Sequence, residues 1–104
     1  MSRCRTALQK DDLWQGEMVG LELQARRVLL INIDGNICAY EDRCQHKSLP
    51  LSKGKLVGTR LFCGAHEWEY DACTGKGVNP SGVALRRYEV QVVDGEIMVD
   101  IDAV

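Results

Sequence analysis

Residues 63–71 read CGAHEWEYD, and 19 residues upstream of Cys63 the stretch 44–46 reads CQH. These two stretches hold both histidines of the 104-residue chain, arranged as Cys44-x-His46 and Cys63-x-x-His66. Two thiolates and two imidazoles can bind one zinc ion tetrahedrally. They can also hold a [2Fe–2S] cluster in which the cysteines bind one iron and the histidines bind the other. The motif pair therefore predicts a metal site of one of these two kinds.

The spacing of the four residues favours the cluster over zinc without excluding zinc. Common zinc fingers place two cysteines together and then two histidines together, whereas each short motif here offers one of each. Two separate loops of that content can grip a two-iron cluster from both sides, each loop giving one ligand to each iron. A catalytic Cys/His pair has less support because it leaves the duplication unexplained. A redox dithiol lacks a Cys-x-x-Cys motif.

Length and composition indicate one soluble globular domain covering residues 1–104. The apolar fraction is 45%, the charged fraction 27%, and the formal net charge −2 from 13 basic and 15 acidic residues. That balance gives no electrostatic reason to expect binding to nucleic acid or to an anionic membrane. The longest aliphatic run, 28–31, is far shorter than the ~20 residues of a membrane span, and no signal peptide is recognisable. We expect a cytoplasmic location with the five cysteines reduced.

The clearest elements are two β-hairpins with Asp-Gly turns. The first turns at Asp94-Gly95 between alternating strands. Its predicted register places three apolar pairs on one face: Val92 with Ile97, Val90 with Val99, and Tyr88 with Ile101.

The second hairpin turns at Asp34-Gly35, with Ile31 opposite Cys38 and Leu29 opposite Tyr40. Alternation of apolar residues over 19–23 predicts a further strand. The segment LQKDDLWQG, residues 8–16, is expected to form one helical turn that ends at Gly16. Short strands fit at 60–63 and 67–70. Strands thus flank a glycine-rich region, about 42–82, that carries both Cys/His motifs.

The C-x-H…C-x-x-H pattern resembles the signature of Rieske proteins, and the resemblance covers essentially the whole chain. It implies an all-β Rieske fold. In that fold an antiparallel β base carries a smaller cluster-binding subdomain, formed by two ligand loops and a third loop around Pro80. It also implies one [2Fe–2S] cluster per chain, with Cys44 and Cys63 on one iron and His46 and His66 on the other.

The run HEWEYDACTGKGVNP, 66–80, looks like the ferredoxin components of bacterial toluene and o-xylene monooxygenases. Rieske ferredoxins of ring-hydroxylating dioxygenases usually have glycine after the second histidine, where Glu67 stands here. The resemblance implies a monomeric one-electron carrier between an NADH-dependent flavin reductase and a di-iron hydroxylase. A ferredoxin of a dioxygenase or nitrite-reductase system is an alternative, and a zinc-stabilised binding module is another.

The same composition argues against catalysis by this chain. An oxygen-activating mononuclear iron site needs two further histidines and a carboxylate, and the chain has no third histidine. The resemblance therefore implies an electron carrier that is not an enzyme.

Two departures from respiratory Rieske proteins predict the redox properties. Leu49 and Ala65 stand where those proteins have an extra disulfide, and Trp68 stands where they have a serine that donates to a bridging sulfide. Fewer donors stabilise the reduced state less, so we expect a potential at the low end of the Rieske range of about −150 to +300 mV. A Tyr70 hydroxyl could still donate to a ligand sulfur.

The remaining candidates surround these ligands. Gln45 and Lys47 could lie on a docking face or simply at the surface. Trp68 could contact a partner or shield the cluster, and Tyr70 could be a core residue or a sulfur donor. Pro80 could shape a loop over the cluster or mark a plain turn. Cys4, Cys38 and Cys73 receive no role.

Overall fold

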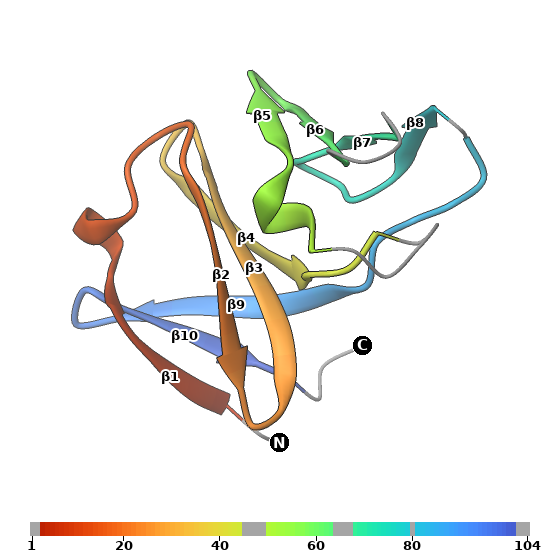
Figure 1. Ribbon diagram of the computed structural model, residues 1–104. Coiled ribbons are helices and arrows are strands. Elements are labelled where there is room, and N and C mark those ends of the chain that lie inside the picture. The colour runs from red at the N-terminus through yellow and green to blue at the C-terminus, as the bar shows by residue number, and fades with distance from the viewer. Residues whose placement is uncertain (1–2, 45–49, 64–67, 80, 102–104) are drawn as a thin grey trace.

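The computed structural model describes residues 3–44, 50–63, 68–79 and 81–101, which form two antiparallel sheets (Figure 1). The larger sheet, here called the base, has the strand order β1-β10-β9-β4-β3-β2. Its strands are β1 Arg3–Gln9, β2 Met18–Leu23, β3 Arg26–Ile33, β4 Asn36–Glu41, β9 Arg87–Val93 and β10 Glu96–Asp100. The prediction of an all-β fold with an antiparallel base is confirmed.

The smaller sheet lies above one end of the base in Figure 1 and has the order β5-β6-β7-β8. Its strands are β5 Lys55–Val57, β6 Arg60–Phe62, β7 Glu69–Asp71 and β8 Gly77–Asn79. Two 3₁₀ turns complete the described elements: η1 Lys10–Asp12 and η2 Leu51–Lys53. None of the helices in the described ranges is long and apolar enough to cross a membrane.

The registers predicted for the two hairpins are confirmed where the ladders extend. Ile31 pairs with Cys38 and Leu29 with Tyr40. In the other hairpin Val92 pairs with Ile97 and Val90 with Val99. The β9–β10 ladder ends at Glu89 and Asp100, so the third predicted pair lies just beyond it. Val92, near the turn at Asp94-Gly95, is 43% exposed, so this end of the predicted apolar face is not buried.

Three β-hairpins of the base turn through positive φ angles, but only two of them use glycine. Asp34-Gly35 and Asp94-Gly95 have φ of 52° and 89°, and 52° and 83°, as the sequence predicts. The β2–β3 turn instead uses Gln24 (φ 49°) and Ala25 (φ 67°). A side chain in this left-handed region costs roughly 1–2 kcal/mol, so the β2–β3 turn is strained.

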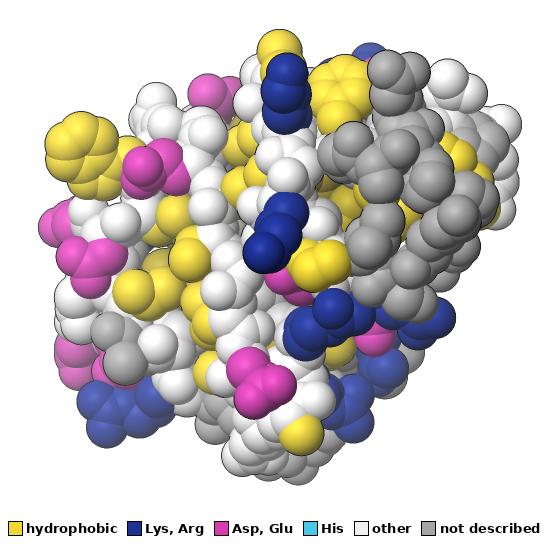
Figure 2. All heavy atoms as spheres, in the orientation of Figure 1, with side chains coloured by type: hydrophobic (Ala, Val, Ile, Leu, Met, Phe, Trp, Pro, Cys, Tyr) yellow, Lys and Arg dark blue, Asp and Glu magenta, His cyan; other side chains and the backbone are white. Residues whose placement is uncertain are grey.

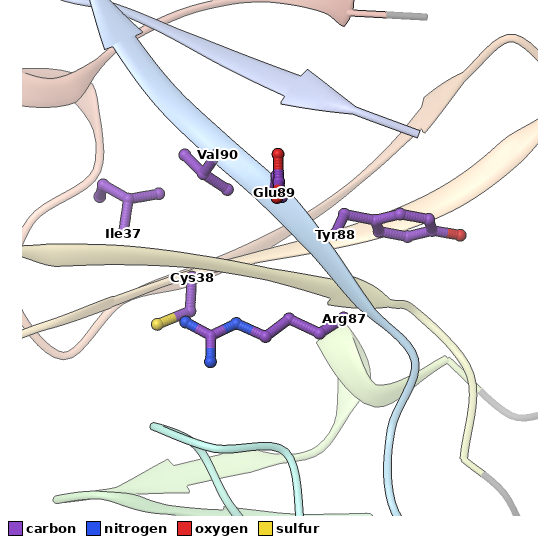
Figure 3. Close-up of a pocket in the computed structure, with 6 residues that line it drawn as sticks. All are labelled: Ile37, Cys38, Arg87, Tyr88, Glu89 and Val90. Carbon is purple, nitrogen blue, oxygen red and sulfur yellow. The ribbon is translucent and has the colours of Figure 1, made fainter. Parts of the chain in front are cut away.

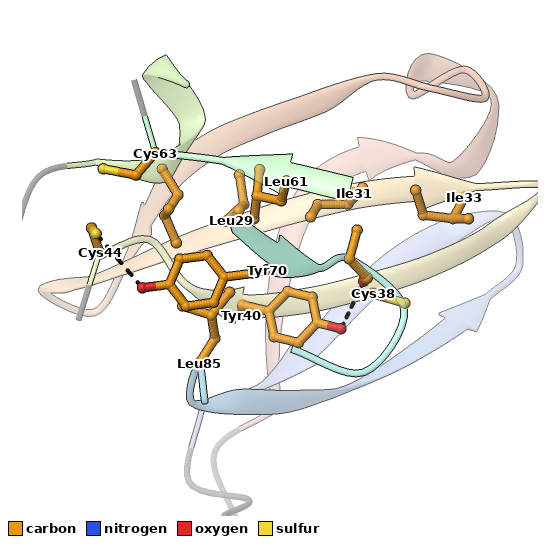
Figure 4. Close-up of a cluster of buried hydrophobic side chains, with 12 residues drawn as sticks. Leu29, Ile31, Ile33, Cys38, Tyr40, Cys44, Leu61, Cys63, Tyr70 and Leu85 are labelled. Atoms are coloured by element: carbon orange, nitrogen blue, oxygen red, sulfur yellow. Dashed lines mark hydrogen bonds between the residues drawn. The ribbon is translucent and has the colours of Figure 1, made fainter. Parts of the chain in front are cut away.

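The buried side chains form two clusters, and only one of them joins the base to the small sheet. The lower core lies within the base and contains Val28, Leu30, Tyr88, Ile97 and Val99 among others. The upper core joins the opposite face of the base to the small sheet (Figure 4). From the base it takes Leu29, Ile31 and Tyr40, and from the small sheet Leu61 and Tyr70. Alternation along β3 explains the division, because successive side chains point to opposite faces.

Three strands and the extent of one turn were not predicted. β1, β5 and β8 have little alternation of their own and form because a partner strand is available. The helical turn predicted over 8–16 is wrong in extent, since only η1 is helical there. Leu8 and Gln9 belong to β1, which pairs with β10. The Lys10 backbone N–H donates to the Gly95 carbonyl (2.7 Å), and this holds the chain in extended pairing up to η1.

Candidate metal centre

Cys44 and Cys63 lie in the same buried cluster although they come from different sheets. Cys44 follows the end of β4 and is 0% exposed, and Cys63 follows β6 and is 2% exposed. Both belong to the upper core. Figure 4 shows the two sulfur atoms at the same end of that core. The fold therefore brings together the two cysteines of the sequence motifs, in an environment that excludes water.

The β6–β7 hairpin positions Cys63. Leu61 pairs with Tyr70 and Phe62 with Glu69. Beyond these pairs the Cys63 backbone N–H donates to the Trp68 carbonyl at 2.8 Å. This bond joins the two described residues that flank 64–67, so it fixes the position of Cys63 against β7.

A buried carboxylate closes the first motif. Asp42 is 4% exposed. Its Oδ1 accepts the Ser52 backbone N–H (2.8 Å), and its Oδ2 accepts the Ser52 hydroxyl (2.7 Å). The end of β4 is thereby tied to η2. Gly20 of β2 makes room for this contact, because a Cβ there would lie 2.5 Å from both Asp42 Oδ2 and Ser52 Oγ.

Tyr70 connects the small sheet directly to the first cysteine. Its hydroxyl lies 3.6 Å from Cys44 Sγ, and the tyrosine is fully buried (Figure 4). A cysteine that ligates a metal is a thiolate and has no proton to give, so in that state the tyrosine hydroxyl donates. The nearby Tyr40 hydroxyl instead donates to the Ala72 carbonyl at 2.8 Å. Both readings made for Tyr70, core residue and sulfur donor, agree with this geometry.

The other predicted site residues are placed unevenly. Trp68 is half-buried and packs against the upper core, which agrees with a shielding role. Gln45, His46, Lys47, His66 and Pro80 lie outside the described residues. Within the described ranges no three His, Cys, Asp or Glu side chains gather to hold a metal ion.

The described donors fit an iron–sulfur cluster. The cysteines sit in an apolar shell that supplies a low dielectric, and a hydroxyl points at one sulfur, which is the kind of contact that tunes such centres. Asp42 and Ser52 were missed by the sequence reasoning. Their only signal was a carboxylate two positions before Cys44, and the partner ten positions later is defined by the fold.

A separate hollow of about 500 Å³ lies where β4 and β9 meet (Figure 3). Its lining residues are Ile37, Cys38, Arg87, Tyr88, Glu89 and Val90. In Figure 3, Arg87 extends along Cys38, whereas Tyr88 points to the other side of the strand. An adjoining hollow also reaches Cys73. This groove does not include Cys44 or Cys63, so it is distinct from the metal centre.

Comparison with known proteins identifies the family. The Rieske [2Fe-2S] domain matches residues 4–89, which include both cysteines and both ligand loops. The chain therefore belongs to the Rieske [2Fe–2S] domain family, and it carries one Rieske cluster. When bound, this cluster takes up and releases one electron.

The relatives define the class more narrowly. The chain is 37% identical over 90 residues to the ferredoxin component of the alkene monooxygenase system of Xanthobacter autotrophicus, covering 86% of this chain and 74% of the relative. It is 28% identical over 96 residues to the naphthalene 1,2-dioxygenase ferredoxin component of Pseudomonas putida, covering 91% and 92%.

A solved structure of a complex between reduced oxygenase and oxidized ferredoxin in carbazole 1,9a-dioxygenase contains a chain of similar fold. It matches with a TM-score of 0.84 at 27% identity, covering 93% of this chain and 91% of that chain. The relatives named here are ferredoxin components, which carry electrons and are not catalysts. This chain is an electron carrier of the same class.

Proposed function

We propose that this ferredoxin carries single electrons from an NADH-dependent flavin reductase to the di-iron hydroxylase of a toluene/o-xylene-type aromatic hydrocarbon monooxygenase. The observation that carries the proposal is the paired Cys44 and Cys63 in a Rieske fold. The relative at 37% identity, which serves a monooxygenase system, supports a partner of that type. Glu67 in place of the glycine usual in dioxygenase ferredoxins supports it as well.

The proposed ligand set is Cys44 and Cys63 on one iron and His46 and His66 on the other. Two ferric ions, two sulfides and two thiolates sum to zero charge, and neutral imidazoles leave it there. Adding an electron is then easier than in a four-thiolate cluster, whose potential lies near −400 mV in plant-type ferredoxins. Buried Cys44 and Cys63 provide the described half of this set.

Substitution of a proposed histidine tests the ligand set. His66→Ala leaves one iron with an open position, so we expect loss of iron and acid-labile sulfide together with loss of the visible absorption. Cys73→Ser, which changes an exposed cysteine outside the ligand set, should retain both. Equal iron and sulfide content in His66→Ala and the parent would contradict the assignment, and zinc without sulfide in the parent would restore the binding-module alternative.

A dioxygenase partner is the second candidate. The 28% identity over 92% of a naphthalene dioxygenase ferredoxin and the likeness to a chain of the carbazole dioxygenase complex support it. The two candidates differ in the enzyme that accepts the electron and not in the carrier's own chemistry.

Reconstitution separates the two candidates. The reduced protein is mixed with a toluene/o-xylene monooxygenase hydroxylase or with the terminal oxygenase of a dioxygenase, and reoxidation of the cluster is followed by stopped flow. A parallel assay adds the flavin reductase and NADH and follows oxidation of the substrate. We expect NADH-dependent substrate oxidation and faster reoxidation with the monooxygenase. Turnover that occurs with the dioxygenase but not with the monooxygenase would overturn the monooxygenase assignment. Interfaces on both sides should be small, below about 1,200 Å² in total, because a carrier must release each partner quickly.

A further inference from the structure

Three arginines line a hollow beside the first ligand loop. The hollow has a volume of about 330 Å³ and is lined by Ala25, Arg26, Arg27, Glu41 and Arg43. It joins the β2–β3 turn to the end of β4. The Asp42 backbone N–H donates to the Arg27 carbonyl (3.0 Å), and this bond holds the two segments together. We call this feature the arginine hollow.

The charge of the arginine hollow is opposite to that of the chain. Three guanidinium groups and one carboxylate give it a formal charge of +2, whereas the whole chain carries −2. Within the described ranges neither Arg26 nor Glu41 takes part in an ion pair, so no direct contact joins this carboxylate to the Arg26 guanidinium. Arg27 and Arg43 have further interactions within the chain, which help to hold them in place.

A fourth arginine, Arg86, is joined to Glu41 by a backbone hydrogen bond. The Arg86 carbonyl accepts the Glu41 backbone N–H at 2.8 Å, and the Arg86 guanidinium lies 5.6 Å from the centre of the Tyr88 ring. Its Nε is buried and has no hydrogen-bond acceptor among the residues that the structure describes. Arg86 thus adds a fourth positively charged residue to the segments that surround the hollow. Figure 2 shows lysine and arginine side chains gathering at the lower right of this face and acidic side chains at the left.

The position of the arginine hollow relates it to electron transfer. Arg43 directly precedes Cys44, and the Asp42 backbone is hydrogen-bonded to Arg27. The cationic surface therefore adjoins the start of the first Cys/His motif. The lining of the hollow includes Ala25 of the strained Gln24-Ala25 turn. Strained backbone persists where the surrounding structure enforces it, and it is enriched at binding sites.

We propose that the arginine hollow is a docking surface for an electron-transfer partner that presents clustered carboxylates. Guanidinium groups bind carboxylates through two parallel hydrogen bonds, which orients the partner as well as attracting it. Complementary charge beside the redox centre raises the rate of productive encounter more than it raises affinity. The proposal rests on the proposed function, because it assumes that the chain exchanges electrons with protein partners.

Charge-matched variants test the proposal. Arg26→Gln removes one positive charge from the hollow, and Arg26→Lys keeps the charge but loses the bidentate geometry. The control Lys10→Gln removes one positive charge from η1, which is not part of the hollow. Second-order rates are measured by stopped flow with the reductase and with the oxygenase over a series of salt concentrations. With one partner we expect the Arg26→Gln rate at low salt to fall about fivefold, the slope against salt to flatten, and Arg26→Lys to recover part of the loss.

Lys10→Gln should change the rate much less than Arg26→Gln, and the midpoint potential and visible spectrum should stay the same in all three variants. Equal effects of Arg26→Gln and Lys10→Gln with both partners would overturn the docking surface while leaving the proposed function intact. If the parent passes electrons to no oxygenase, the proposed function fails.

A partner-free measurement then decides the docking surface. Fluorescence anisotropy of labelled hexaglutamate at low salt should show binding to the parent that is weakened about fivefold in Arg26→Gln and unchanged in Lys10→Gln. Equal binding by all variants would overturn the proposal. Competition by inorganic phosphate at concentrations as low as those of the peptide would assign the hollow to a small anion and would also overturn it.

Discussion

At the scale of single residues, the hydroxyl of Tyr70 is the described group best placed to tune the cluster. It lies 3.6 Å from Cys44 Sγ in a site without solvent. The extra electron of the reduced state increases the negative charge on the sulfurs, so a donated hydrogen bond stabilises that state and raises the potential. Trp68 occupies the position where respiratory Rieske proteins have a second donor, so Tyr70 should carry a large part of this tuning.

Removing that hydroxyl should lower the midpoint potential. A hydrogen-bond difference of about 0.5–1.5 kcal/mol between the oxidation states corresponds to roughly 20–65 mV for one electron. Voltammetry of Tyr70→Phe measures this shift. Tyr40→Phe is the matched control, because it removes a buried hydroxyl that bonds the Ala72 carbonyl. Its potential should stay near that of the parent, and equal shifts in both variants would show that Tyr70 acts only through packing.

Cys73 is exposed, yet its thiol should react slowly near neutral pH. Incomplete hydration and the nearby Asp71 carboxylate raise the pKa of Cys73 above its ordinary value. The thiolate is the reactive form, so the alkylation rate should rise only at a pH above that of an ordinary cysteine. Site-resolved mass spectrometry after iodoacetamide treatment across a pH series measures this rate.

Asp71→Asn provides the comparison for Cys73. It keeps an oxygen for the Cys73 backbone N–H, which now donates to Asp71 Oδ1 at 2.8 Å, while removing the charge. The pH profile should move part of the way toward lower pH, since the loss of hydration remains. An unchanged profile would remove Asp71 as a cause.

At the scale of elements, the β2–β3 turn combines tight geometry with residues that fit it poorly. Ala25 has a φ of 67° where the two other hairpins of the base have glycine. Ala25→Gly should relieve roughly 1–2 kcal/mol of strain and lose about 0.5–1 kcal/mol through added freedom of the unfolded chain. We expect a net gain of about 0.5–1 kcal/mol, visible as a rise of a few degrees in the thermal midpoint.

Gly35→Ala makes the opposite change in a turn where a Cβ would meet nothing within 4 Å. It should lower the midpoint because only the φ of 89° opposes it. A lower midpoint for Ala25→Gly would mean that Ala25 makes packing contacts that outweigh its strain.

The elements also show how far the sequence predicts this structure. Both Asp-Gly hairpins and their registers followed from alternation and turn chemistry, since these are local signals. β1, β5 and β8 did not, because each depends on a partner strand distant in sequence. The pairing of Cys44 with Cys63 was predicted from motif chemistry. The β3–β4 register brings 26–27 beside 41–43, but the arginine hollow itself was not predicted, because alternation and turn signals do not show where side chains leave a hollow.

At the scale of the whole molecule, the two cores make the base and the small sheet unequal in their dependence on the metal. The upper core contains Cys44 and Cys63, and neither of these two cysteines belongs to the lower core. The strands of the small sheet have three residues each, the short end of the usual range. The base has its own buried cluster and longer strands.

Removal of iron should therefore loosen the small sheet first. After chelation, hydrogen exchange followed by mass spectrometry should speed up at least about tenfold across 55–79, while β3, β4, β9 and β10 keep their protection. The iron-loaded protein under the same conditions is the control. Equal loss of protection in both sheets would show that the two cores unfold as one unit.

The ladder between β1 and β10 joins Arg3 to Asp100 and Cys4 to Val99. A ribosome makes β1 long before β10, so β1 must wait until the whole segment between them has been made before its partner exists. Such long-range pairing also slows folding, because loop closure precedes any gain in contacts. The base is thus completed only after β10 has been made, and β1 stays exposed as an unpaired strand until then.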